Sequence, residues 1–121
     1  MPLPDYERCH LFPLQWGDEA AEGFMYAHST EFNKGIQKRL ENFAREWRDT
    51  APPGAELRVE VTALTYPRDL QGSAWGDVLQ EVSYKFTDVG TGRRWTIQFN
   101  IEPPPGGKVQ EVAAPFTGGL P

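Results

Sequence analysis

The sequence has a single cysteine, Cys9, in 121 residues. One thiol can form no internal disulfide and cannot build a zinc site from several thiolates. Long apolar runs are also lacking, because charged or structure-breaking residues interrupt the chain well before the ~20 positions that a membrane span needs. Residues 1–30 contain no basic segment followed by a continuous apolar run, so no signal peptide is visible. We therefore expect a chain without an internal disulfide and without a membrane partner.

An excess of positive charge is lacking too. The chain has 12 Lys and Arg against 17 Asp and Glu, a net charge of −5. Proteins that bind nucleic acid usually carry a basic footprint, so the total argues against that role. Residues 30–48 differ, with a net charge of +2. We expect a patchy surface, basic around His10 and Arg45 and acidic elsewhere.

An amphipathic helix is predicted over residues 30–49. One apolar stripe recurs at helical spacing: Phe32, Ile36, Leu40, Phe43 and Trp47. Thr30 is the expected N-cap, because its hydroxyl can accept a free backbone N–H of the first turn. The segment Pro52-Pro53-Gly54 ends the helix.

Three strands are predicted where apolar and polar residues alternate, over residues 56–66, 79–88 and 93–102. A glycine-rich turn at 88–92 joins the last two as a hairpin, and the first run pairs with that hairpin. A short N-terminal strand is expected over residues 7–12, followed by a loop through Pro13, Gly17 and Gly23. Residues 103–121 are rich in proline and glycine. We predict one α+β domain over residues 1–102, its helix on one face of an antiparallel sheet, and a tail over 103–121.

Polar residues with a common chemistry lie on the helix and on the first strand. Asn33, Gln37, Glu41 and Arg45 step by four along one helix edge. The ordinary interpretation is a solvated face, where an ion pair contributes only about 0.3–0.5 kcal/mol. Arg8 and His10 are two residues apart on the strand and share a face.

Together these residues match the needs of metal-assisted phosphodiester hydrolysis. A neutral imidazole such as that of His10 can deprotonate water near pH 7. An amide oxygen such as that of Asn33, helped by a carboxylate acting through water, can hold a hydrated Mg²⁺. Arginines such as Arg8 can neutralise the phosphate as charge develops.

Two motifs carry a resemblance to a known family. Residues 7–10, E-R-C-H, are similar to the D-R-G-H motif of the DNA/RNA non-specific endonucleases, the ββα-metal nucleases. Residues 33–41, N-K-G-I-Q-K-R-L-E, resemble the metal-binding helix N-x-G-x-x-x-R-L-E of that family, and Arg45 stands at its later arginine. Residues 59–66 are similar to its V-x-V-T-x-x-Y strand. The resemblance covers residues 5–102, with Glu7 and Cys9 replacing an aspartate and a glycine.

The resemblance implies a ββα-metal core and a role for each matched residue. The general base falls on His10, and the direct Mg²⁺ ligand falls on Asn33. Glu41 would bind water on the metal, and Arg8 and Arg45 would contact phosphate. Arg39 matches the motif without an assigned role.

The implied function is a Mg²⁺-dependent endonuclease, with Mn²⁺ able to substitute. It would cut DNA with little sequence preference, and RNA is the second candidate substrate. Compact relatives of this family are C-terminal toxin domains of polymorphic secreted effectors. That context implies a cognate immunity protein, and secretion or delivery into a target cell with action in its cytoplasm.

Other interpretations stay open. A catalytically inactive relative that acts as a protein-binding module fits the net charge and Cys9, whereas no residue set supports a small-molecule-binding domain. A thiol nucleophile at Cys9 is disfavoured, because adjacent strand residues such as His10 point to the opposite face. His28 is expected to be a loop residue rather than a second metal ligand. Four aromatic residues are candidates for stacking on bases, the last of them more suited to the core: Trp16, Tyr26, Trp75 and Trp95.

Overall fold

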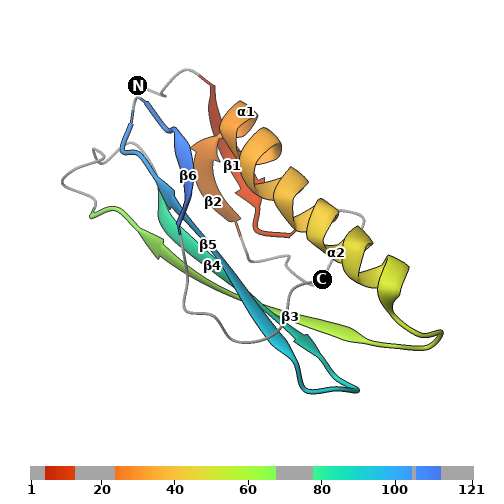
Figure 1. The fold of residues 1–121 in the computed structure, drawn as a ribbon. Helices are drawn as coiled ribbons and strands as arrows, with labels where there is room; N and C mark the ends of the chain where they lie inside the picture. Colours follow the sequence, from red (N-terminus) through yellow and green to blue (C-terminus); the bar gives the residue numbers. More distant parts are fainter. Residues whose placement is uncertain (1–4, 13–23, 68–77, 105, 113–121) are drawn as a thin grey trace.

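The computed structural model describes residues 5–12, 24–67, 78–104 and 106–112. Two short strands pair first, β1 (Tyr6–His10) and β2 (Phe24–His28). A helical run follows, made of α1 (Ser29–Glu31), η2 (Phe32–Gln37) and α2 (Lys38–Thr50). Four further strands complete the described chain: β3 (Leu57–Thr65), β4 (Leu79–Asp88), β5 (Arg94–Ile101) and β6 (Val109–Val112). The predicted α+β class is confirmed, with the helix packed against antiparallel sheets (Figure 1).

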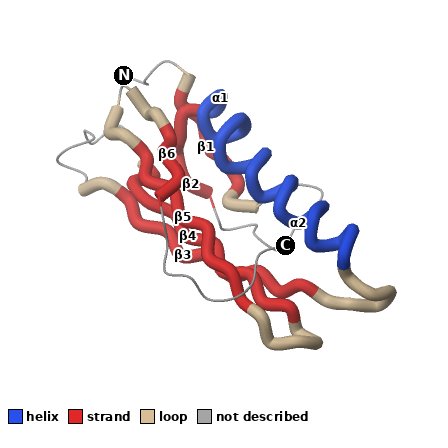
Figure 2. The backbone as a smooth tube through the Cα atoms, in the orientation of Figure 1, coloured by secondary structure: helices blue, strands red, loops and turns tan. Residues whose placement is uncertain are grey.

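The larger sheet is antiparallel in the order β3-β4-β5-β6. The three predicted strands are confirmed to within two residues at each end, and β4 and β5 form the predicted hairpin. Their inward side chains make the core together with the helix, which lies along one side of the strands (Figure 2). Tyr84 and Phe86 of β4 are fully buried, and Phe99 of β5 is nearly so.

The helix buries the predicted apolar stripe. Phe32, Ile36, Leu40 and Phe43 are each at most 2% exposed, whereas Trp47 is half-buried. The helix begins one residue earlier than predicted, so Thr30 as N-cap is wrong. His28 is the N-cap and makes no side-chain cap bond. The backbone N–H of Ser29 instead donates to the carbonyl of Asp5 at 2.9 Å, so the residue that precedes β1 supplies the acceptor that a cap would provide.

The second turn of the helix is a π segment, which the periodicity did not predict. The backbone N–H of Lys38 donates to the carbonyl of Asn33, five residues earlier. Within this segment Gly35 faces β6, where a Cβ would lie 3.3 Å from Cγ1 of Val109. The glycine therefore permits a close approach of helix and strand. The wider winding also changes the phase of Asn33 relative to residues of α2 along the predicted polar edge from Asn33 to Arg45.

Two strands lie where the sequence predicted none. β2 occupies part of the predicted N-terminal loop, and it pairs with β1 over all five residues. A bridge between Tyr26 and Val78 connects it to the larger sheet. β6 lies within the predicted C-terminal tail and pairs with β5, Val109 opposite Ile101. The sheet therefore has four strands, and residues 109–112 belong to the domain.

Gly107 precedes β6 in a conformation that favours glycine. Its φ is +70°, and a Cβ would lie 2.6 Å from the Tyr6 hydroxyl oxygen and 2.9 Å from Cβ of His28. Gly54 also has a positive φ, +81°, but no atom lies within 4 Å of its Cβ position. A substitution at Gly54 would therefore introduce backbone strain alone, whereas one at Gly107 would introduce the same strain and a steric collision.

We predict that Gly107→Ala destabilises the protein more than Gly54→Ala. Both changes place an L side chain in the left-handed region, at a cost of about 1–2 kcal/mol. At Gly107 the collision adds about 1–3 kcal/mol. Urea denaturation of both variants measures the difference, and equal losses would show that the β6 connection is looser than described.

Asp88 fixes the end of β4. Its Oδ1 accepts hydrogen bonds from the backbone N–H of Gly90 at 3.0 Å and of Thr91 at 3.2 Å. Its Oδ2 accepts one from Nε1 of Trp47 at 3.1 Å. These hydrogen bonds lower the pKa of the Asp88 carboxyl, and the one from Trp47 has the largest effect.

We predict that Asp88 makes the fold acid-sensitive. Because its pKa is depressed in the folded state, its stabilisation is complete above the ordinary carboxyl range and is lost as pH falls through the folded pKa. The unfolding free energy of Asp88→Asn should therefore depend less on pH between 5 and 2 than that of the parent protein. Asp49→Asn, at an exposed position near the end of α2, is the control. If the unfolding free energies of the parent protein and of Asp88→Asn change with pH in the same way, this role of Asp88 is contradicted.

Candidate functional site

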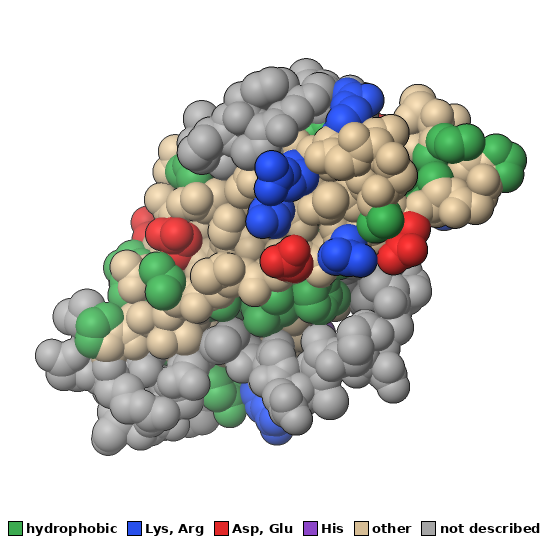
Figure 3. Space-filling view, turned by 90° about the horizontal axis from the view of Figure 1, so that it is seen from below, with side chains coloured by type: hydrophobic (Ala, Val, Ile, Leu, Met, Phe, Trp, Pro, Cys, Tyr) green, Lys and Arg blue, Asp and Glu red, His purple; other side chains and the backbone are tan. Residues whose placement is uncertain are grey.

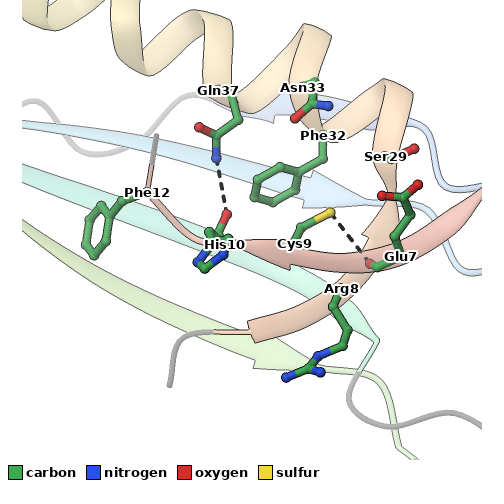
Figure 4. Close-up of a pocket in the computed structure, with 9 residues that line it drawn as sticks. All are labelled: Glu7, Arg8, Cys9, His10, Phe12, Ser29, Phe32, Asn33 and Gln37. Carbon is green, nitrogen blue, oxygen red and sulfur yellow. Dashed lines mark hydrogen bonds between the residues drawn. The ribbon is translucent and has the colours of Figure 1, made fainter. Parts of the chain in front are cut away.

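A pocket of about 170 Å³ lies between β1 and the first turns of the helix (Figure 4). Residues 7–10 and Phe12 line it from the strand side. Ser29, Phe32, Asn33 and Gln37 line it from the helix side. The π segment contributes three of these helix residues, so the irregular turn forms one wall of the pocket.

Three of the five predicted site residues line this pocket: Arg8, His10 and Asn33. Gln37, which shared their polar edge but received no role from the sequence, links the two walls. Its Nε2 donates to the backbone carbonyl of His10 at 3.2 Å. This bond fixes the end of β1 against the helix, and the recurrence of Gln37 four residues after Asn33 was the available indication of its importance.

The two faces of β1 present different chemistry to the pocket. Glu7 and Cys9 point toward the helix, while Arg8 is directed away from it (Figure 4). His10 alternates with Cys9 and shares the face of Arg8, as strand geometry requires. Asn33 is exposed on the helix. The helix side of the pocket therefore holds a carboxylate, a thiol and an amide.

The other two predicted residues lie further along the helix. Glu41 and Arg45 do not line the pocket, and Nη2 of Arg45 donates to Oδ1 of Asn42 at 2.9 Å. Eight residues of helix rise separate Asn33 from Glu41 by about 12 Å along an ideal axis, and the π segment changes their relative phase. Arg39 has a structural partner instead, because its Nε lies 3.1 Å from Oε1 of Glu111 on β6.

Cys9 occupies the position where the endonuclease motif has glycine. Its side chain is partly buried against the core, with Sγ 3.6 Å from the carbonyl oxygen of Glu7 and 3.9 Å from that of Ala27. Burial raises the pKa of this thiol to about 11, and the charge of Glu7 contributes. The thiol is thus protonated at neutral pH, which argues against a nucleophilic role.

The oxygen donors at the pocket suit a hard cation. Among the described residues, no three His, Cys, Asp or Glu side chains gather as metal ligands. Mg²⁺ keeps several waters and needs only one or two protein oxygens, which the amide of Asn33 and the carboxylate of Glu7 can supply. The donor set therefore fits a hydrated Mg²⁺ better than a softer metal.

The remaining candidates lie outside this pocket. His28 is on β2 rather than in a loop, and its Nε2 lies 3.7 Å from Oδ2 of Asp5. Trp95 is buried in the core, as expected. Tyr26 packs beside a small cluster of Tyr6 and Val78. Trp16, Trp75 and the predicted loop residues Pro13, Gly17 and Gly23 lie outside the described residues.

No protein-family model matches the chain, and no curated protein or solved structure is detectably similar to it. The resemblance to the endonucleases therefore rests on the sequence alone, on the motifs of residues 7–10 and 33–45 and on the strand at 59–66. In the part of the chain that the structure describes, no helix is long and apolar enough to cross a membrane.

We predict that Cys9 reacts slowly with alkylating reagents in the folded protein. A rise of its pKa from 9.0 to about 11 lowers the thiolate fraction at pH 7.5 about 100-fold. Iodoacetamide labelling, followed by mass spectrometry, should be slower by at least this factor in buffer than in urea. Equal rates would show that the thiol is solvated and that the pocket is more open than described.

Proposed function

We propose that this protein is a Mg²⁺-dependent endonuclease that hydrolyses phosphodiester bonds of DNA, with RNA as the second candidate substrate. The observation that supports it best is the pocket itself, whose lining includes residues of two motifs far apart in sequence: Arg8 and His10 of β1, and Asn33 of the helix. The Arg8 side chain points away from the helix, so it would meet phosphate on the other face of β1 (Figure 4). The chain order adds support. Two antiparallel strands, β1 and β2, directly precede the helix that carries Asn33, which is the order named in a ββα core.

Each residue has a defined task in this proposal. His10 takes a proton from the attacking water, since a neutral imidazole is a base near pH 7. Asn33 would hold Mg²⁺ directly, and the bound ion, which Mn²⁺ can replace, would supply charge stabilisation at the phosphate. Glu41, expected to bind a water on the metal, does not line the pocket, so the geometry does not support this role. Arg8 and Arg45 neutralise phosphate charge. Because Arg45 lies beyond the pocket, its contact would be with a phosphate further along the strand.

The biological setting follows from the resemblance. We propose an antibacterial effector toxin domain that is secreted or delivered into a target cell, acts in its cytoplasm and is neutralised by an immunity protein. A net charge of −5 limits the salt-dependent, non-specific binding of the protein to nucleic acid. The helix, with its net charge of +2 over residues 30–48, still offers local attraction for one phosphate at a time.

A second function, a catalytically silent protein-binding module, is favoured by one feature of the pocket. The Cys9 side chain points toward the helix, where the motif has a glycine, and the Arg8 side chain points away (Figure 4). A thiol in this position fills part of the pocket wall that a glycine would leave open. In that case the pocket would be a remnant of a nuclease site, and the surface would serve binding.

Digestion of plasmid DNA and of RNA in Mg²⁺ or Mn²⁺ tests the proposal. We expect His10→Ala to lower the rate about 10²–10⁴-fold, the range of general-base contributions. Asn33→Ala should lower it as well and should raise the Mg²⁺ concentration needed for half-maximal rate. Matched controls are His28→Ala and Asn100→Ala, which change the same residue types outside the pocket and should retain cleavage.

Cys9→Gly separates the two functions. If the protein is an active nuclease, this variant cleaves at least as fast as the parent chain. If the parent chain is inert and the Cys9→Gly variant cleaves, the parent chain is the catalytically silent protein-binding module. If both are inert with every divalent ion, or if His10→Ala cleaves as fast as the parent, the nuclease proposal is wrong.

A further inference from the structure

β3 forms one edge of the larger sheet, and no described strand pairs with its outer side. The backbone directions along it follow from one hydrogen bond just before β3: the carbonyl of Glu56 accepts from the N–H of Val89, the residue after β4, at 3.0 Å. Backbone groups alternate in direction along a strand, and the register places Arg58 and Glu60 in phase with Glu56. The N–H and C=O groups of the odd-numbered residues, such as Val59, therefore point outward from the sheet.

This edge has few of the devices that usually prevent edge-to-edge pairing, and its one register irregularity lies near the end of the strand, between Leu64 and Thr65. Native sheets shorten their edge strands, or place proline, lysine or inward-pointing charges on them. The opposite edge, β6, is only four residues long. β3 has nine residues, contains no proline or lysine, and carries its charges on the outer face. Basic and acidic side chains lie side by side on the surface seen in Figure 3.

An apolar groove runs beside the same strand. It has a volume of about 350 Å³, and Leu57 and Val59 line it opposite Ala44 and Trp47 of α2. The side chains of Leu57 and Val59 are only half-buried, because the helix covers β4 and β5 more fully than β3. The residues that offer free backbone groups at the edge are thus the ones whose apolar side chains remain partly exposed.

We propose that a second copy of this chain pairs with β3 in antiparallel orientation, about a twofold axis at Val59. In this register Arg58 lies opposite Glu60 of the partner subunit, and the contact is repeated by symmetry. Glu60 already faces Lys85 on the neighbouring strand β4. In the dimer each Glu60 carboxylate would therefore lie between Lys85 and Arg58 of the partner subunit. Opposite charges that face each other across strands favour pairing.

Other registers are less complementary or less extensive. A twofold axis at Leu57 places Arg58 opposite Glu56 of the partner subunit, but the rest of β3 then faces residues 49–56, which lie outside the strand. A twofold axis at Glu60 places this carboxylate against its own copy, and an axis at Arg58 does the same for the guanidinium. Like charges directly opposite each other are destabilising. An axis at Val61 places Glu60 opposite Thr62 and leaves Arg58 opposite Leu64, so neither charge has a partner across the interface.

The proposed dimer joins the two four-stranded sheets into one of eight strands. Val59 exchanges both backbone hydrogen bonds with its own copy, and Leu57 does so with Val61 of the partner subunit. Both helices lie on the same face of the joined sheet. The two grooves meet at the axis, so the half-buried side chains of Leu57 and Val59 become covered.

Analytical ultracentrifugation over a range of concentrations tests the proposal. The parent chain should change from 13.7 kDa toward twice that mass. Glu60→Arg should weaken dimerisation at least tenfold, and the swap Arg58→Glu with Glu60→Arg should restore it. Glu102→Arg changes the charge equally away from β3 and should have no effect. A parent chain that stays monomeric to millimolar concentration overturns the proposal, as does a dimer that Glu60→Arg leaves unchanged.

Disulfide trapping tests the register. In a Cys9→Ser background, Arg58→Cys and Glu60→Cys occupy opposite positions of a non-hydrogen-bonded pair, about 4.5 Å apart at Cα, within disulfide range. A mixture of the two variants should cross-link under mild oxidation. Each variant alone should not, because its own copy lies diagonally about 7–8 Å away. Preferential cross-linking of either variant alone would overturn the register.

Discussion

The burial of one apolar helix stripe against β4 and β5 is the interaction on which the rest of the fold depends. The Phe43 ring stacks on Phe86 with centroids 4.4 Å apart and meets Trp95 edge-on at 5.4 Å. Ile36 and Leu40 are completely buried, and each such side chain contributes about 1.5–3 kcal/mol relative to exposure. This contact fixes the helix, and the smaller elements are then attached to it. β1 is held through Gln37.

The dominant elements could be predicted because their sequence period matches their geometry. The stripe from Phe32 to Trp47 and the alternation in three strands specify which faces are buried, and burial decides the structure. β2 and β6 could not be predicted in this way. β2 exists because β1 pairs with it and Tyr26 reaches Val78, and the four residues of β6 are too few for a period. Both depend on contacts between distant segments.

In the candidate site, too, the features set by local geometry could be predicted, whereas those set by distant contacts could not. Arg8 and His10 share a strand face because local geometry requires it, and Asn33 lies nearby because the helix packs beside β1. The position of Asn33 relative to Glu41 was not predictable, since it depends on the π segment. That segment lies where Gly35 admits Val109 of β6, a contact invisible to helical periodicity. A regular α-helix is the default expectation, and the π segment departs from it at the turn that bears the proposed metal ligand.

We propose that the pocket between β1 and the π segment binds a hard divalent cation through Asn33. Paramagnetic broadening by Mn²⁺ in amide NMR spectra tests it without relying on turnover. We expect saturable broadening centred on residues 7–10 and 33–37, which Mg²⁺ competes away and which is weaker in Asn33→Ala. Broadening centred on other acidic residues, or unchanged in Asn33→Ala, would contradict it.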